Sequence, residues 1–348
     1  MKNFKEILKL FISWRLLILL AVLIFTPLTN SFKVFANFDG IRFLDIAKEG
    51  YGTPNTYYSY LLFPFFPLLI RLFSPLFGYF SSGLFVSHLF DLGSLYVFQL
   101  LASLDYPKKT VRTSLLLLLS FPSVFFLVSV YSESLFLFLC LLSVYLTRKK
   151  YFLFSGLVAA LASYTRLAGL FLWLILVIEY YQENKHNIKA FLKPTTLFLL
   201  LPPLGSLFYL NYLQLNASNI ERFLLSIPSK FVFLHQVIFR YLKMLILVDH
   251  SSSLFLVVLT ESLVGFFALY LLIASFRRLR FSYWLYLFLS FFVPTLWGDF
   301  VSLPRYLLVV FPFFFFLGDW YERQHPYFQK SYLLVSIALL FVNLGLFV

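Results

Sequence analysis

The chain contains a single cysteine, Cys140, among its 348 residues. One cysteine cannot form a disulfide within the chain or a cysteine-ligated metal site, and its place inside an apolar run indicates a small buried residue. Charged residues are also scarce, at 12% of the chain, and they cluster between apolar runs. The sequence has no P-loop, no GxSxG, no HExxH and no GxGxxG motif, which argues against a nucleotide-driven pump and the other chemistries that these motifs serve.

Apolar residues are abundant instead. They make up 61% of the chain, aromatic residues make up 22%, and phenylalanine alone occurs 48 times. A water-soluble chain of this length could not bury so much apolar surface. Many of the apolar runs approach the roughly 20 residues that a helix needs to cross a bilayer. The composition therefore predicts an all-α, polytopic integral membrane protein.

The basic residues predict how the chain crosses the membrane. The net charge of +13 is read as the charge of cytoplasmic loops, and no basic patch interleaved with aromatic residues indicates nucleic-acid binding. A topology of eleven spans with a cytoplasmic N-terminus leaves every basic cluster on the cytoplasmic side. The predicted spans cover residues 10–29, 82–104, 113–130, 132–147, 151–165, 167–181, 195–213, 253–275, 281–297, 303–319 and 331–347.

One stretch of this topology is too short for two full membrane crossings. Residues 151–181 must leave the cytoplasmic side and return to it, yet a helix of this length covers only ~46 Å. Two full crossings need ~60 Å of hydrocarbon thickness. The stretch is expected either to form a re-entrant hairpin, with Arg166 below the surface at its midpoint, or to lie where the bilayer is thin.

The whole chain, 1–348, is expected to form a single membrane domain with two long outer loops, 30–81 and 214–252. In the first loop, Ile41, Leu44 and Ala47 fall at helical spacing, and Arg42, Asp45 and Glu49 face the other way. This pattern predicts a short amphipathic helix that lies along the membrane interface. Asp39 stands just before that helix, where it can act as an N-cap, as a catalytic group, or as both.

Further polar residues are expected at the outer face or inside the spans. Glu133 lies at a turn between two spans, where a carboxylate needs a cation, a hydrogen-bond network or a function. Arg166 and Arg305, at outer edges of spans, suit the phosphate of a lipid, although snorkelling to the headgroups explains each one equally well. Asp299 is predicted on the same face. Glu261, inside span 253–275, is expected to contribute to helix packing.

The sequence resembles the PIG-V-like mannosyltransferases of the GT-C class, which use polyprenyl-phosphate-linked sugars. The resemblance is carried by five short segments in the family's order: FDGIRFLDIAKEGY (38–51), FPFFPLLIRL (63–72), YSESLF (131–136), YTRLAGL (164–170) and SLPRYLLVVFPFF (302–314). The family usually has tryptophan where this chain has Phe38, a change beside the acidic residue rather than at it. Residues 214–252 show no match.

The resemblance implies a multi-span helical enzyme in the plasma membrane of a prokaryote or the endoplasmic reticulum of a eukaryote. Its active site would face away from the cytoplasm. The donor would be mannose on a polyprenyl or dolichyl phosphate, and the acceptor a lipid-linked glycan or another glycan. An acidic residue of the first outer loop, here Asp39, would be the general base of an inverting transfer. Arg42, Asp45, Glu133, Arg166, Asp299 and Arg305 would bind substrate. No metal or cofactor is expected.

Two other classes of protein fit part of this pattern. A transporter or flippase for a lipid-linked sugar would also place charges along a membrane path, but inverted repeats are not visible, and the charges favour one edge of the membrane. A non-catalytic scaffold would not need an acidic residue at position 39, and Asp39 is present.

Overall fold

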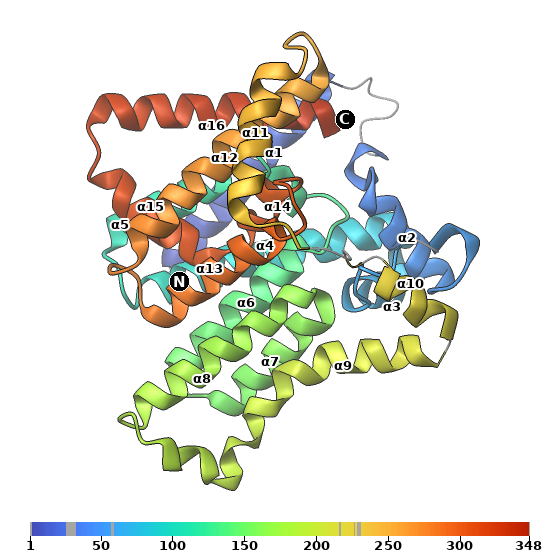
Figure 1. Ribbon diagram of the computed structural model, residues 1–348, viewed down its shortest axis with the longest axis vertical. Coiled ribbons are helices and arrows are strands. Elements are labelled where there is room, and N and C mark those ends of the chain that lie inside the picture. The colour runs from blue at the N-terminus through green and yellow to red at the C-terminus, as the bar shows by residue number, and fades with distance from the viewer. Residues whose placement is uncertain are drawn as a thin grey trace. The chain divides into compact units, whose positions relative to one another are not determined.

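The computed structural model describes residues 2–25, 33–56, 59–215, 217–225, 227 and 231–347. Within these ranges the chain forms sixteen α-helices joined by turns and short 3-10 segments, and it forms no β-strand (Figure 1). The predicted all-α class is therefore confirmed. The end of the first predicted span, 26–29, and the first residues of the loop 30–81 lie outside the described ranges.

The helices follow one another with few long connections. In chain order they are α1 (Lys2–Phe25), α2 (Asp39–Glu49), α3 (Phe65–Phe77), α4 (Tyr79–Ala102), α5 (Lys108–Leu119), α6 (Glu133–Arg148), α7 (Phe152–Thr165), α8 (Phe171–Glu183), α9 (Leu201–Gln214), α10 (Ala217–Leu225), α11 (Leu234–Leu247), α12 (Ser253–Ser275), α13 (Phe281–Thr295), α14 (Leu303–Leu308), α15 (Phe311–Glu322) and α16 (Pro326–Phe347).

Five helical stretches are long and apolar enough to cross a membrane: Phe4–Phe25, Tyr79–Ala102, Thr196–Gln214, Ser253–Ser275 and Pro326–Phe347. They coincide with five of the eleven predicted spans. The helices at the other six positions have 16 residues or fewer. A helix of 16 residues covers ~24 Å, less than the ~30 Å thickness of the hydrocarbon core.

Two predicted spans are wrong as continuous helices. The span 113–130 breaks after Leu119, and only a 3-10 segment, Val124–Leu127, follows. The span 303–319 is divided between α14 and α15. A proline lies near each break, Pro122 in the first and Pro312 in the second. Proline has no N–H to donate and clashes with the preceding turn, which outweighs the apolar character that suggested an unbroken helix.

The chain divides into two compact units. Unit 1 comprises Met1–Val34, Ala102–Phe126 and Pro228–Val348, and unit 2 comprises Phe35–Leu101 and Leu127–Ile227. Each unit is built from segments that are distant in the sequence.

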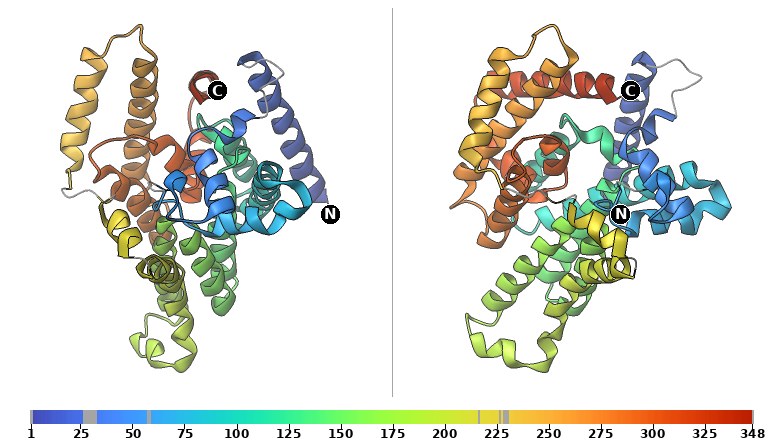
Figure 2. Two further views of the ribbon diagram at one scale, coloured as in Figure 1. Left: turned by 90° about the vertical axis from the view of Figure 1, so that its right-hand side faces the viewer. Right: turned by 45° about the vertical axis from the view of Figure 1, so that its right-hand side comes forward.

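In unit 2, α7 packs closely between α6 and α9, as Figures 1 and 2 show. Small residues bring the backbones of α7 and α9 together. A Cβ at Gly205 would lie 2.0 Å from the carbonyl oxygen of Ala160, so only glycine fits there. The Ser163 hydroxyl donates to the Pro202 carbonyl at 2.5 Å, and the Ser206 hydroxyl donates to the Ser163 carbonyl at 3.1 Å. Close contacts between small residues are typical of helix packing in membranes.

In unit 1, α5 packs against α15, and α11 runs beside α12 (Figures 1 and 2). A Cβ at Gly318 of α15 would lie 2.0 Å from the hydroxyl oxygen of Ser114 on α5, so the two helices touch at this glycine. The hydroxyls of Thr110 and Thr113 each donate a 2.8 Å hydrogen bond to the Glu322 carboxylate. These contacts tie the two helices together.

The two long outer loops of the sequence analysis are largely helical. The first contains α2 and α3, and the second contains α10 and α11. A helix is present where the amphipathic helix was predicted, namely α2, and its position along the membrane interface stays a prediction. The buried residues of α2 are Gly40, Phe43, Leu44, Ile46 and Ala47. Ile41, on the predicted apolar face, is 53% exposed.

Candidate functional site

Asp39 is the first residue of α2, and the N-cap position before it belongs to Phe38. The prediction that Asp39 occupies the N-cap is therefore wrong by one residue. Phe38 has φ 53° and ψ −117°, a backbone conformation that a bulky L-residue rarely adopts. Holding it costs about 1–3 kcal/mol, and such strain persists only where the surrounding structure imposes it. Here it occurs directly before the candidate base.

Contacts with residues 130 and 131 hold the entry to α2. The Val130 amide donates to the Phe35 carbonyl at 2.7 Å. The Tyr131 hydroxyl donates to the Asn37 carbonyl at 2.8 Å. A Cβ at Gly40 would lie 3.3 Å from the Val130 carbonyl oxygen, so the first turn of α2 packs closely against residues 130 and 131. The backbone around Asp39 is therefore fixed by the segment that leads into α6.

Glu133 begins α6, two residues after Tyr131, and forms an ion pair with Arg166. The Nη1 atom of Arg166 lies 2.6 Å from Oε1 of Glu133. The Glu133 side chain is fully buried, whereas the Arg166 side chain is 17% exposed. A cation is one of the partners that the sequence analysis gave for a carboxylate at this turn. The pair places a guanidinium in the same unit as Asp39.

Arg166 lies at the turn between α7 and a 3-10 segment, Leu167–Leu170. Its backbone is extended, with φ −154° and ψ 144°, so α7 ends there. A Cβ at Gly169 would lie 2.4 Å from backbone atoms of Ala162 and Ser163, so the turn requires glycine. The Arg166 guanidinium carbon also lies 5.7 Å from the centre of the Phe136 ring. The turn and these contacts fix the orientation of the side chain.

The exposed face of α2 carries the other charged residues predicted for this loop. Arg42 Nη1 lies 3.5 Å from Asp39 Oδ1, and both side chains are partly exposed, so the pair contributes little to stability. Asp45 is half-buried on the same helix. Burial raises the pKa of Asp45 above its ordinary value, the charge of Lys48 opposes this shift, and the charge of Glu49 adds to it.

Arg71 is a residue of this region that the sequence analysis did not single out. It lies on α3, and its Nε and Nη2 atoms donate to the carbonyls of Ala47 and Lys48 at 2.7 and 2.8 Å. These carbonyls are in the last turn of α2, where a cation complements the helix dipole and satisfies free acceptors. The signal in the sequence was an arginine within an otherwise apolar segment, FPFFPLLIRL.

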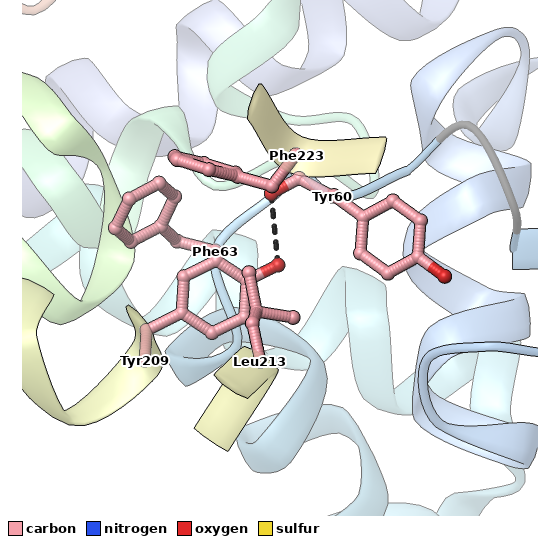
Figure 3. Close-up of a cluster of buried hydrophobic side chains, with 5 residues drawn as sticks. All are labelled: Tyr60, Phe63, Tyr209, Leu213 and Phe223. Atoms are coloured by element: carbon pink, nitrogen blue, oxygen red, sulfur yellow. Dashed lines mark hydrogen bonds between the residues drawn. The ribbon is translucent and has the colours of Figure 1, made fainter. Parts of the chain in front are cut away.

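An aromatic cluster fixes the connection between α2 and α3 (Figure 3). It consists of Tyr60, Phe63, Tyr209, Leu213 and Phe223, all buried. The Tyr209 hydroxyl on α9 donates to the Tyr60 carbonyl at 2.8 Å, the dashed line in Figure 3. Because Phe223 belongs to α10, the first helix of the second long loop shares a core with the first long loop.

Asp299 and Arg305 belong to unit 1, whereas the other five predicted site residues belong to unit 2. Asp299 Oδ1 accepts a hydrogen bond from the Val301 amide at 3.1 Å. Arg305 lies on α14, with its guanidinium carbon 5.1 Å from the centre of the Phe126 ring. Ser302, the N-cap residue of α14, has a left-handed backbone with φ 59°. Residues 299–305, which include both charged residues, thus contain one residue with a strained backbone.

Asp39 and Asp45 lie on α2, whereas Glu133 lies on α6. In the part of the chain that the structure describes, no three His, Cys, Asp or Glu side chains are grouped as a metal site would require. The transfer without divalent metal that was expected from the sequence stays a prediction.

The fold of the chain is similar to that of ArnT from Cupriavidus metallidurans in two crystal structures. With ArnT bound to undecaprenyl phosphate, the TM-score is 0.56 at 14% sequence identity, over 95% of this chain and 63% of that one. With ArnT in the apo state, the TM-score is 0.51 at 16% identity, over 95% of this chain and 62% of that one. The chain therefore spans less than two thirds of the length of ArnT.

No known protein-family profile matches the chain. No curated protein matches it in sequence. The TM-scores show an ArnT-like fold, and at identities of 14% and 16% the likeness shows the fold alone. The PIG-V-like resemblance and the roles of the individual site residues stay predictions.

Proposed function

We propose that this protein is a membrane glycosyltransferase that moves a sugar from a polyprenyl or dolichyl phosphate to a lipid-linked or glycan acceptor. The observation that carries the proposal is the fold that 95% of the chain shares with ArnT, a protein crystallised with undecaprenyl phosphate. This is the fold class that the GT-C resemblance implies. Mannose as the sugar depends on the PIG-V-like segments alone.

In the proposed reaction, Asp39 takes the proton of an acceptor hydroxyl as that oxygen attacks the anomeric carbon of the donor sugar. The bond between the anomeric carbon and the phosphate oxygen breaks on the opposite face, so the configuration inverts. The products are the glycosylated acceptor and the free lipid phosphate. Two features support Asp39 for this role: its position at the start of α2, and the tightly held backbone around it.

Arg166 is proposed to bind the phosphate of the donor. Its guanidinium has five N–H donors, and the ion pair with Glu133 is made by Nη1. Glu133 orients the guanidinium and balances its charge in the apolar surroundings, which is the usual requirement for a buried charge. A pre-oriented arginine stabilises negative charge on the leaving phosphate without reorganising during the reaction.

Four further residues keep the roles that the sequence predicts. Arg305 is proposed to bind donor phosphate, and Asp299, Arg42 and Asp45 are proposed to bind substrate. Partial exposure of Arg42 and half-burial of Asp45 are compatible with such contacts. The sequence-based topology of eleven spans, with the active site on the non-cytoplasmic face, belongs to the same proposal.

The proposal is tested by giving the purified protein radiolabelled polyprenyl-phosphate mannose and a lipid extract, then separating labelled products. We expect a labelled lipid or glycan to appear with wild-type protein and not with the Asp39→Asn variant. A matched variant, Asp319→Asn, loses an exposed aspartate–arginine pair of α15 and should retain activity. Movement of the labelled donor between bilayer leaflets, with no transfer product, would instead support the transporter alternative.

A further inference from the structure

Glu261 is a carboxylate buried inside an apolar membrane span. Glu261 lies in α12 and is 7% exposed. Both of its carboxylate oxygens accept hydrogen bonds. Oε2 accepts from the Tyr241 hydroxyl at 2.7 Å, and Oε1 accepts from the Ser302 amide at 3.2 Å. The sequence analysis expected a helix-packing role for Glu261. The hydrogen bond to Ser302 shows that it also holds the backbone just before α14.

Tyr241 of α11 contacts the same segment. Its hydroxyl, besides donating to Glu261, accepts a hydrogen bond from the Phe300 amide at 3.0 Å. Burial, and then the hydrogen bond to Glu261, raise the pKa of Tyr241 above its ordinary value, so the hydroxyl keeps its proton and donates. The Tyr241 and Phe300 rings are 4.7 Å apart between centres. A Cβ at Gly265 would lie 2.7 Å from the Phe300 ring, so α12 leaves room for that ring.

Arg240, next to Tyr241, forms a third contact. Its Nη1 atom donates to the Gly298 carbonyl at 2.6 Å. Gly298 has φ 98°, which favours glycine. Three side chains therefore bind backbone groups of residues 298, 300 and 302: Arg240 and Tyr241 from α11, and Glu261 from α12. Figures 1 and 2 show these two helices side by side.

The held segment, 298–302, is strained; it carries one predicted site residue and leads into another. Ser302 has a left-handed backbone, which costs free energy for a residue other than glycine. Its amide is one of the groups bound by Glu261. Asp299 lies within the segment, and Arg305 follows Ser302 by less than one helical turn. A strained conformation persists only when its surroundings impose it.

We propose that Glu261 and Tyr241 are positioning residues that hold residues 298–302 in the conformation in which Arg305 binds the donor phosphate. This inference rests on the proposed function, because it takes Arg305 as a phosphate ligand. It also makes α11, a helix of the second long loop, part of the apparatus that controls donor binding. Neither residue touches substrate in this account.

A positioning role and a plain packing role predict different kinetics. If the segment is released, only a fraction of molecules has the binding-competent conformation, and the apparent donor affinity falls by that fraction. The donor KM then rises, while kcat at saturating donor stays nearly unchanged. A residue that only packs would lower thermal stability without changing the ratio of KM to kcat.

The test compares Tyr241→Phe with Thr113→Val. Tyr241→Phe keeps the ring and loses both hydroxyl contacts. Thr113→Val loses a hydrogen bond to the Glu322 carboxylate elsewhere in unit 1 and is the matched control. The measurements are donor KM, kcat and the hydrogen-exchange rate of residues 298–302, where the amides of Phe300 and Ser302 are hydrogen-bonded to Tyr241 and Glu261.

We expect Tyr241→Phe to raise both the donor KM and the exchange rate of residues 298–302 by about tenfold, as the loss of two buried hydrogen bonds implies. Glu261→Gln, which keeps an oxygen for the Ser302 amide, should shift both in the same direction by less, and it serves if Tyr241→Phe does not fold. Thr113→Val should shift neither. Exchange rates over 298–302 that are equal in Tyr241→Phe and in Thr113→Val would overturn the proposal.

The exchange rate is independent of the proposed function. If the wild-type protein neither binds nor transfers from a polyprenyl-phosphate sugar, the proposed function fails. The exchange rate then still decides whether Glu261 and Tyr241 hold the segment. If transfer occurs and residues 298–302 of Tyr241→Phe exchange faster with an unchanged donor KM, Tyr241 holds the segment but the segment does not control donor binding.

Discussion

Arg166 Nη1 lies 2.6 Å from Oε1 of Glu133, and the carboxylate of this pair is fully buried. A buried charge without its partner is costly, so each residue of the pair requires the other. The sequence placed both residues at edges of apolar runs, 33 positions apart, and it indicated that Glu133 needs a partner such as a cation without showing that Arg166 is that cation. Their contact gives unit 2 an oriented guanidinium.

Removing one member of this pair should destabilise the protein strongly. Arg166→Met is expected to cost about 3–5 kcal/mol, because the charge of Glu133 stays buried, and Glu133→Leu should cost less, because Arg166 is partly exposed. The double variant should recover much of that stability, yet it should remain inactive if Arg166 binds the donor. Thermal unfolding in detergent and a transfer assay measure the two effects separately. Full activity in the stable double variant would remove Arg166 from the mechanism.

Asp39→Asn should abolish turnover and leave donor binding intact. The amide has nearly the same size and cannot accept the proton, and loss of a general base typically lowers the rate by about 10²–10⁴-fold. Donor binding is measured with a polyprenyl phosphate, and turnover with the labelled donor. Undiminished turnover in this variant would show that Asp39 is not the general base and has only a structural role at the start of α2.

Arg71→Ala should loosen α2 from its C-terminal end. The guanidinium makes two hydrogen bonds to helix carbonyls but is partly exposed, so we expect a loss of about 1 kcal/mol in stability. Hydrogen exchange should increase over 39–49, and turnover should fall because Asp39 is less well held. Arg323→Ala, which breaks an exposed pair with Asp319, is the control and should change neither. Unchanged exchange in α2 would show that Arg71 does not hold it.

Single cysteines test the predicted sidedness. Ile41 and Val301 are 53% and 56% exposed, Lys149 is also exposed, and the native Cys140 is fully buried. Cysteine at 41 and at 301 should react with an impermeant thiol reagent in intact cells, and cysteine at 149 should react only after lysis. The reverse pattern would invert the topology and move the proposed site to the cytoplasmic side.

The sequence predicted those features of the fold that follow from the pattern of apolar and polar residues. Apolar runs predicted the all-α class, and the polar face of α2 followed from the spacing of Arg42, Asp45 and Glu49. The prediction of continuous helices over 113–130 and 303–319 was wrong. Both runs are apolar, but each contains a proline near the point where its helix breaks. The position of the N-cap before α2 depended on the unusual backbone of Phe38, which residue preferences do not indicate.

Contacts between distant segments could not be predicted from a single sequence. Arg166 and Glu133 pair through the packing of α6 and α7, and Arg71 reaches α2 from the next helix. The network around Glu261 joins α11, α12 and the segment before α14. A buried carboxylate signals that partners exist, but the chain must fold before these partners can be named.

A donor comparison in liposomes tests the central claim most directly. The protein is given either polyprenyl-phosphate mannose or GDP-mannose, each with a lipid acceptor extract and a chelator of divalent metals. The account predicts transfer from the lipid-linked donor and none from the nucleotide sugar, because the oriented arginine is proposed to meet the charge of a membrane-bound phosphate. Transfer from GDP-mannose alone, or complete loss of transfer on chelation, would contradict it.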